Sequence, residues 1–158
     1  MKQHVKIGAG SIVLTVFSIA LFIPFMFFNN PPLPVQILLG AIVVGIVLSG
    51  LYYMPISICA DSSSIRINRC LKTRVIPMAD VKSVKMHTPS KGTIRLCGSG
   101  GFMGFWGWFR EKETGLYFAY CGRPKECFLV ELHSGRKYLL GCNNPQLMVE
   151  YIRIMAGV

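Results

Sequence analysis

Most of the first third of the sequence lacks charge. No Asp, Glu, Lys, Arg or His occurs in residues 7–53. All seven acidic residues lie between Asp61 and Glu150, and fifteen of the seventeen Lys and Arg residues follow Tyr53. The mean hydropathy of +0.47 is high for a soluble domain, and the uncharged block is its source. A chain of 158 residues with such a block has room for one water-facing domain with a modest core.

The sequence also lacks the patterns of a metal centre, a nucleotide site or a catalytic set. The six cysteines form no C-x-x-C pair, and the three histidines are far apart in the chain. The glycine-rich residues 98–109 lack the Gly-Lys-Ser/Thr ending of a phosphate loop. No nucleophile, histidine and acid form a recognisable set. We therefore expect no enzyme, cofactor, metal or small-molecule substrate, and the charges match no known nucleic-acid reader.

The uncharged block divides into two runs with the length of membrane-spanning helices. As helices, residues 7–28 would extend about 33 Å and residues 35–53 about 28 Å, against a hydrocarbon core of about 30 Å. Asparagines and paired prolines in residues 29–34 favour a tight turn between them. The sequence predicts a transmembrane helical hairpin in residues 1–54 and a second domain in residues 55–158.

Basic residues near the ends of the runs orient this hairpin. Lys2 and Lys6 precede the first run, further basic residues follow the second, and the turn has none. The positive-inside rule then predicts that both termini are cytoplasmic. A cleaved signal peptide is the alternative for the first run, but its apolar stretch is long and lacks a small-x-small exit. In a reducing compartment the cysteines are expected as free thiols, whereas a disulfide framework would require the opposite topology.

Small residues lie on one face of the second run, at Gly40, Ala41, Gly45 and Ser49. Such a face would permit close packing against the first helix or against a second copy of the chain in a homo-oligomer. Glycine is also common in membrane helices that have no such role. The sequence leaves both interpretations open.

After residue 54 the hydrophobic pattern changes to the alternation typical of strands. We expect strands at residues 56–59, 64–69, 75–77, 81–86, 93–97, 116–120, 127–132 and 137–140, with a hairpin turn at residues 133–136. A cap at residues 143–145 then begins an amphipathic helix whose apolar stripe is Leu147, Met148, Tyr151, Ile152 and Met155. The expected fold class is α+β, with a run of short strands and one C-terminal helix.

This order of elements resembles the pleckstrin-homology (PH) fold. The stretch Ile76-Pro77-Met78-Ala79-Asp80-Val81-Lys82-Ser83-Val84 is similar to the I-P-x-x-D-I-x-x-V stretch of bacterial PH-like domains. Residues 98–109 resemble the glycine-aromatic segment of one such family, and Asn144-Pro145 its polar-Pro helix start. The resemblance covers residues 55–156. It implies an antiparallel β-barrel or sandwich of about seven strands capped by the helix, a binding or scaffolding role in a bacterium, and no catalytic residue.

The glycine-aromatic segment holds the candidates for contact with the membrane interface or a partner: Phe102, Phe105, Trp106, Trp108 and Phe109. Tryptophan favours the headgroup zone of a bilayer, and the domain would lie directly beneath one. Alternatively, the aromatic side chains fill the core and the glycines mark a bulged strand corner.

Two groups of basic residues are candidates for contact with anionic lipid. The first is Arg66, Arg69, Lys72 and Arg74, and the second is Arg95, Arg110 and Lys112. The resemblance adds that phosphoinositide-binding PH domains carry basic residues in a place comparable to the first group. The alternative is a solvated strand face that also supplies the positive-inside signal.

Together these features predict a non-enzymatic, membrane-anchored interaction module of the bacterial inner membrane. It would bind a protein partner or anionic lipid of the bilayer at the cytoplasmic surface. The alternative function is an accessory or assembly subunit of a larger transporter or channel complex, acting through the hairpin. The absence of ionisable residues in residues 7–53 disfavours an ion path within the hairpin itself.

Overall fold

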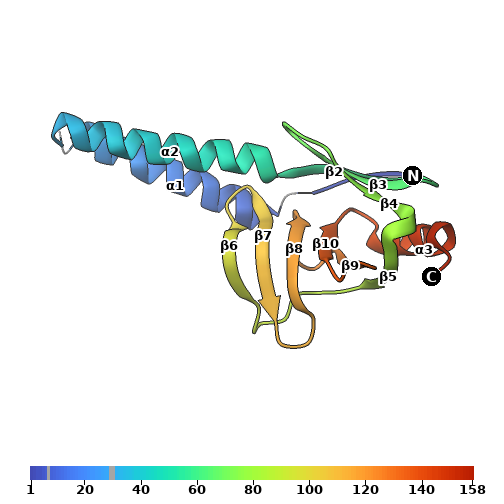
Figure 1. Cartoon of the computed structure of the whole chain (residues 1–158). Helices are drawn as coiled ribbons and strands as arrows, with labels where there is room; N and C mark the ends of the chain where they lie inside the picture. Colours follow the sequence, from blue (N-terminus) through green and yellow to red (C-terminus); the bar gives the residue numbers. More distant parts are fainter. Residues whose placement is uncertain (7, 29–30) are drawn as a thin grey trace.

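Two helices project from one side of a β domain that ends in a third helix (Figure 1). The computed structural model describes residues 1–6, 8–28 and 31–158. Helix α1 (Ala9–Phe28) and helix α2 (Leu33–Tyr53) lie side by side and antiparallel, close to the two predicted runs. Helix α2 accommodates Pro34 because its first turn needs no backbone donor there. The predicted start of the first run at Ile7 and the Asn29-Asn30 part of the turn lie outside the described residues.

Within the described residues, one helix is long and apolar enough to cross a membrane. This helix is α2, and apolar side chains such as Ile37, Leu38 and Val44 on it are exposed. A surface of this kind suits lipid rather than water. The side chains of Ile19 and residues 22–28 of α1 lie outside the described part, so the crossing by α1 stays a prediction.

The strands form two sheets. The first sheet has four strands in the order β1 (Lys2–His4), β2 (Pro55–Ala60), β3 (Ser64–Arg69) and β4 (Arg74–Pro77). The 3-10 turn η1 (Met78–Asp80) leads into the second sheet. That sheet has six strands in the order β5 (Val81–Met86), β9 (Cys127–Leu132), β10 (Lys137–Gly141), β8 (Gly115–Cys121), β7 (Gly104–Glu111) and β6 (Ile94–Gly101).

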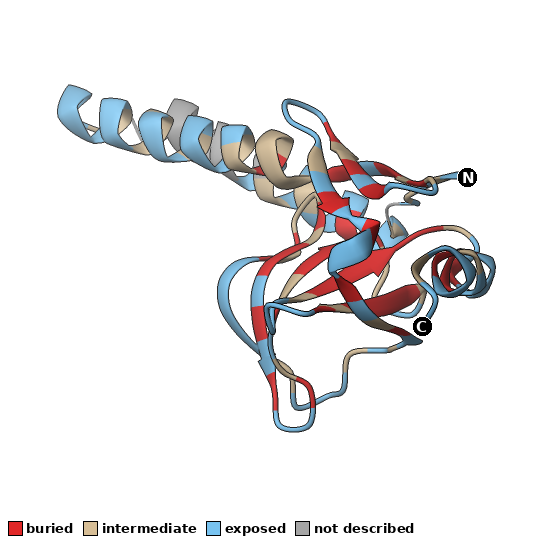
Figure 2. Ribbon diagram, turned by 45° about the vertical axis from the view of Figure 1, so that its right-hand side comes forward, coloured by how far each residue is buried: buried red, intermediate tan, exposed pale blue. Residues whose placement is uncertain are grey.

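The main core lies between the sheets and beneath α3 (Pro145–Ala156), as Figure 2 shows by burial. Alternation along β3 turns Ile65 and Ile67 inward, and both are fully buried. Met148 and Ile152 of α3 are likewise 0% exposed, which confirms the centre of the predicted apolar stripe. Leu147 and Met155 of that stripe are 51% and 40% exposed, and Val149 is buried instead, so the buried face is rotated from the predicted one. Helix α3 begins after Asn144 with Pro145 in its first turn and ends at Gly157, whose φ of 70° suits glycine.

Three features differ from the predicted sandwich of about seven antiparallel strands. Residues 2–4 form an additional strand, β1, which pairs through its backbone and so needs no apolar pattern. Residues 104–111 form the full strand β7 between β6 and β8. Strands β8 and β10 pair in parallel, because the β9–β10 hairpin brings β10 back beside β8. Strand β1 precedes the predicted boundary at residue 54, and the division into two domains stays a prediction.

Candidate functional site

The glycine-aromatic segment forms the β6–β7 hairpin, with Phe102 and Met103 in its two-residue turn. Gly101 pairs with Gly104 across the turn, and Ser99 Oγ donates a hydrogen bond of 2.6 Å to the Phe102 carbonyl. Met103 has a φ of 53°, an uncommon value for a residue with a side chain. The turn is therefore tightly specified rather than a loose loop.

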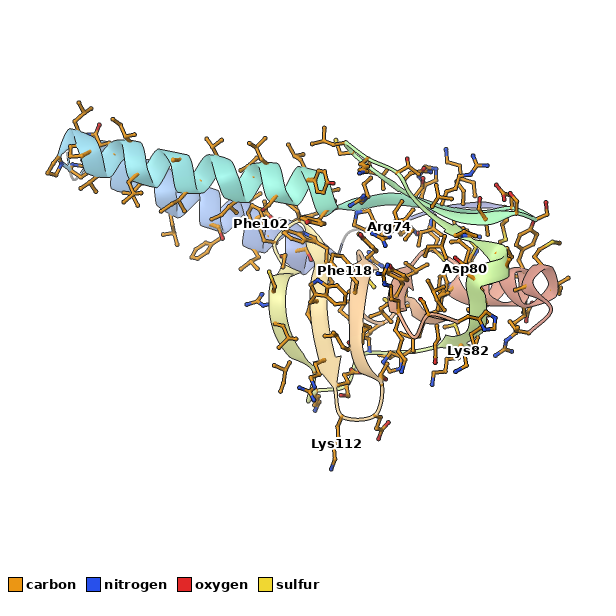
Figure 3. The ribbon with its side chains drawn as sticks, viewed as in Figure 1. Arg74, Asp80, Lys82, Phe102, Lys112 and Phe118 are labelled. Carbon is orange, nitrogen blue, oxygen red and sulfur yellow. The ribbon has the colours of Figure 1, made fainter. Side chains whose placement is uncertain are left out.

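This turn packs against both N-terminal helices. The Met103 backbone N–H donates to Thr15 Oγ1 of α1 at 3.1 Å. A Cβ added at Gly50 of α2 would lie 2.5 Å from Met103 Sδ, so any larger residue there would displace the Met103 side chain. Thr15 lies six residues beyond Ala9, or about 9 Å along α1. The hairpin turn thus contacts the helices above their domain ends, with Phe102 beside them (Figure 3).

Glycine is also required where β6 and β7 face each other. Gly98 pairs directly with Gly107, and their φ values are 118° and 123°. A Cβ on either residue would lie 2.2 Å from a carbonyl oxygen of the opposite strand. The two strands therefore approach more closely than residues with side chains would permit.

The aromatic candidates of β7 divide between its two faces. Trp106 is 8% exposed and stacks on Tyr53 of α2 with ring centroids 5.1 Å apart. Trp108 is 42% exposed and meets Phe118 edge-on at 5.2 Å. Phe105 and Phe109 lie on the opposite face, where Phe109 is buried. The five candidates therefore share no single surface, and neither Trp106 nor Phe109 is accessible to a bilayer.

The first group of basic candidates also divides. Arg66 forms an ion pair of 2.8 Å with Asp61. A side-chain hydrogen bond from Ser63, backbone N–H groups of Ser63 and Ser64, and Arg66 lower the pKa of Asp61 to about 2. Arg66 on β3 therefore pairs with the turn that precedes this strand. Arg69, Lys72 and Arg74 instead line a common cavity.

The second basic group is spread along the β6–β7–β8 hairpins. Arg95 and Arg110 are exposed on β6 and β7, where Arg110 pairs with Ile94 in the sheet register. Lys112 lies at the β7–β8 turn, at the opposite end of β7 from Phe102 (Figure 3). Because Arg95 pairs with Phe109, Arg95 and Arg110 lie on opposite faces of the sheet, and Lys112 is separated from the helix pair.

A cavity of about 610 Å³ lies between the end of α2 and the open side of the two sheets. We call it the basic cavity. Its walls come from α2, the β3–β4 connection, β7, β8, β10 and the turn before β10, through Tyr52, Tyr53, Arg69, Lys72, Thr73, Arg74, Val75, Trp108, Phe118, Tyr120, Arg136 and Tyr138. Sequence reasoning missed Tyr120, Arg136 and Tyr138, because no spacing in the chain connects these residues with the end of α2.

Arg69 and Arg74 are held on aromatic rings in this cavity. The Arg69 guanidinium lies 5.1 Å from the ring centroid of Tyr52 and 5.5 Å from that of Tyr120. Arg74 lies 5.1 Å from the Tyr138 ring and donates to Tyr138 Oη at 2.6 Å. Burial raises the pKa of Tyr120, and the two guanidinium groups partly offset this effect. Such cation–π contacts fix the charges in place without neutralising them.

A second polar cluster lies at the far end of the β6–β7 hairpin. Glu111 is 5% exposed, contacts His87 Nε2 at 2.8 Å, and accepts hydrogen bonds from the Ser90 N–H and Thr93 Oγ1. Burial raises the pKa of Glu111, but these hydrogen bonds outweigh it and leave the pKa below its ordinary value. Burial and the Glu111 charge together raise the pKa of Tyr117 beside it. Both carboxylate oxygens of Glu111 have polar partners, whereas the buried Tyr117 Oη has no hydrogen-bond partner among the described residues. We assign the cluster a structural role.

The predicted small-residue face of α2 is open. Within the described part of the chain, a Cβ added at Gly40 or Gly45 would meet no atom within 4 Å. Ala41 is exposed and Ser49 half-buried, with Ser49 Oγ donating to the Ile46 carbonyl. In the described residues this face therefore has no neighbour, and its packing role stays a prediction.

The cysteines of the structure are free thiols. Cys121, Cys127 and Cys142 are buried, and burial raises the pKa of Cys121 and takes that of Cys142 to about 12. Thiols with raised pKa values are poor nucleophiles and metal ligands. Across residues 1–6, 8–28 and 31–158, no three His, Cys, Asp or Glu side chains gather as a metal site would require.

Comparison with known families identifies the domain that carries these sites. The bacterial PH domain model matches residues 56–155, from β2 to the end of α3. The chain belongs to the bacterial PH domain family. No curated protein and no solved structure matches the chain significantly. PH-like domains are generally non-enzymatic interaction modules, and in this bacterial PH domain the basic cavity and the β6–β7 hairpin both lie where the domain meets the helices.

Proposed function

We propose that this bacterial PH domain is a membrane-anchored interaction module whose β6–β7 hairpin lies in the interface of the bilayer that α2 crosses. The observation that carries the proposal is the contact between the hairpin turn and the helices. Met103 reaches Thr15 and Gly50, which lie about 9 Å and 4.5 Å along the helices from their domain ends at 1.5 Å per residue. A bilayer surrounding these helices would therefore reach the turn.

The edge of the sheet supports the same orientation. Strand β6 is an edge strand, and the helices project past it (Figure 1). Ile94 and Leu96 on β6 are 62% and 57% exposed, although apolar side chains on an unprotected edge invite aggregation in water. Contact with lipid would cover them, and Arg95 and Arg110 beside them would meet anionic headgroups. Anionic lipid at the cytoplasmic surface is therefore the binding partner that we propose.

The natural thiol of Cys97 allows a direct test. Cys97 is exposed on β6, and Cys70→Ser removes the other fully exposed thiol. An environment-sensitive fluorophore on Cys97 of the full chain, in vesicles with brominated lipid, is expected to be strongly quenched. The matched control places the fluorophore at Ala79→Cys in a chain lacking Cys70 and Cys97. Ala79 is exposed and precedes Asp80, which lies away from the helices (Figure 3). Equal quenching at both positions would contradict the proposal.

The charge requirement has its own measurement. Quenching at Cys97 is expected to be stronger in vesicles with phosphatidylglycerol than in phosphatidylcholine alone, and to weaken as salt screens the headgroups. Arg95→Gln with Arg110→Gln should remove this difference, because each near-surface cation contributes about 1 kcal/mol. Quenching that is independent of lipid charge in the unsubstituted chain would leave the hairpin at the interface but exclude anionic lipid as its partner.

The open face of α2 favours a second candidate function, that of an accessory subunit or homo-oligomer assembled through the helices. A Cβ at Gly45 meets nothing in the described residues, so Gly45→Leu would block a neighbouring helix without disturbing the domain. Gly50→Leu is unsuitable, because it would also displace Met103. Crosslinking between copies that carry Gly45→Cys would identify a homo-oligomer, and a larger native assembly that Gly45→Leu dissociates would identify a subunit role.

A further inference from the structure

The basic cavity concentrates positive charge without acidic compensation. Arg69, Lys72, Arg74 and Arg136 line it, and no Asp or Glu does. The four ion pairs found in the described part of the chain use none of these residues. Four cations around one cavity repel one another, and a buried cation without a partner is costly. We propose that the cavity is a binding site for a phosphate group, as a phosphate monoester or diester.

Arg69 is the central residue of this site. It is 9% exposed, and a guanidinium remains charged in any protein environment. Its Nε donates to the Lys72 carbonyl at 2.9 Å, whereas its two Nη atoms make no hydrogen bond within the described residues. Neither Nη atom is among the side-chain atoms that are fully buried without a hydrogen-bond partner. Both Nη atoms are therefore open to solvent. Arg69 therefore presents free donors to the cavity.

The surrounding structure compensates only part of this charge. The Arg69 guanidinium contacts the rings of Tyr52 and Tyr53 in the last turn of α2. The carboxyl end of a helix provides about half a negative charge, and aromatic faces provide less. Lys72, Arg74 and Arg136 remain without an opposing charge. An anion of one to two charges is the complement that the cavity lacks.

The arrangement of donors suits phosphate. Arg69 ends β3 and Arg74 begins β4, so one short connection delivers two planar guanidinium groups with Lys72 between them. Guanidinium forks bind phosphate oxygens in pairs, and Lys adds a point charge. Arg136 approaches from the β9–β10 turn, and Tyr138 Oη, which already accepts from Arg74, has its own hydrogen to donate. The volume of about 610 Å³ falls within the usual range of ligand pockets, about 300–1,000 Å³.

The position of the cavity favours a lipid headgroup as the source of the phosphate. Tyr52 and Tyr53 form one wall and are the last two residues of α2. When α2 crosses a bilayer, its last turn lies at headgroup level. The lipid source therefore rests on the proposed function, whereas a soluble phosphate compound would bind the same cations without it.

The first arm of the test uses soluble phosphate. Inorganic phosphate and glycerol phosphate are titrated into the full chain in phosphatidylcholine nanodiscs while tryptophan emission is followed. Trp108 lines the cavity and is one of two tryptophans, so Trp108→Phe should abolish a saturable change in emission.

The cations of the cavity are tested one at a time. Lys72→Gln and Arg136→Gln alter exposed side chains, and each is expected to weaken phosphate binding about fivefold, from about 1 kcal/mol per cation. Lys125→Gln, an exposed cation outside the cavity, should have no effect. Arg69 is left unchanged, because it is buried and its substitution would also affect folding.

The second arm uses lipid. The full chain is extracted from membranes containing phosphatidylglycerol and phosphatidylcholine, and native mass spectrometry measures the retained lipid. Retained phosphatidylglycerol that is lost in the double variant Lys72→Gln/Arg136→Gln, together with soluble phosphate binding, identifies a lipid headgroup. Soluble binding without lipid retention identifies a soluble phosphate compound.

Two results would overturn the inference. One is the absence of both soluble phosphate binding and selective lipid retention. The other is equal binding by the unsubstituted chain and the double variant. The soluble arm can succeed even if the fluorophore at Cys97 is not quenched, so failure of this inference and failure of the proposed function are distinguishable.

Discussion

Strands β7 and β8 present different chemistry on their two faces. One face carries Trp106, Trp108, Phe118 and Tyr120, and it borders the basic cavity with its four cations. The other carries Phe105, Phe109, Tyr117 and Ala119, which enclose a smaller pocket of about 280 Å³ without a charged side chain in its lining. Both faces are rich in aromatic residues, with four on the first and three on the second. The difference shows that the function of an aromatic residue here depends on which element covers its face.

The covering elements explain this contrast. On the first face, the end of α2 brings Tyr53 onto Trp106, and the β3–β4 connection brings Arg69. On the second face, residues 89–93 and Pro124 close a local cluster that ends in the Glu111 hydrogen bonds. The first face thus joins the domain to the helices, and the second stabilises the hairpin itself.

The largest expected effect comes from removing the contact between the first face and α2. Trp106→Ala should destabilise the full chain by about 3–5 kcal/mol, because a buried ring stacked on Tyr53 leaves a cavity. Trp108→Ala, at 42% exposure on the same face, should cost much less. Chemical denaturation in detergent measures both. Trp106→Phe is the control: Trp106 Nε1 has no hydrogen-bond partner among the described residues, so its loss should matter little. Equal losses of unfolding free energy for Trp106→Ala and Trp108→Ala would contradict the idea that α2 covers only the first of these rings.

The next effect concerns the close approach of β6 and β7. Gly107→Ala should destabilise the chain by about 2–4 kcal/mol, because a strained φ of 123° adds to a Cβ that would lie 2.2 Å from the Cys97 carbonyl oxygen. Gly135→Ala has a positive φ but open space around it, so it should cost only the strain of about 1–2 kcal/mol. Thermal unfolding of the two variants compares them. A larger loss at Gly135 would contradict the close approach of the strands.

The smallest effect concerns the polar end of the second face. Glu111→Gln should cost about 1–3 kcal/mol at neutral pH, because Ser90, Thr93 and His87 lose a charged acceptor. The folded pKa of Glu111 is depressed below the ordinary 4.5. Its contribution is therefore complete above about pH 4.5 and is lost as pH falls through the folded pKa. The difference in unfolding free energy between the unsubstituted chain and Glu111→Gln should shrink on acidification. A difference that stays constant with pH would contradict a stabilising role for the Glu111 carboxylate.

Much of the fold follows from local patterns. The runs of residues 7–28 and 35–53 predicted both helices, and alternation predicted strands such as β3, β5 and β9 within one or two residues. The resemblance at residues 76–84 predicted the family. Strand β1 and the parallel pairing of β8 with β10 were not predictable, since both depend on contacts between distant segments.

The sequence by itself determined the apolar α2, the strand pattern, the C-terminal helix and the excess of positive charge, because each depends on neighbouring residues and their period. Only the tertiary structure decided which charges act together. Arg66 and Arg69 are three residues apart on β3, yet Arg66 pairs with Asp61 and Arg69 enters the basic cavity beneath Tyr52. Likewise Trp106 and Trp108 share a strand face, and packing against Tyr53 buries only the first. The physical reason is that burial and charge compensation depend on elements distant in sequence, which only the folded chain brings together.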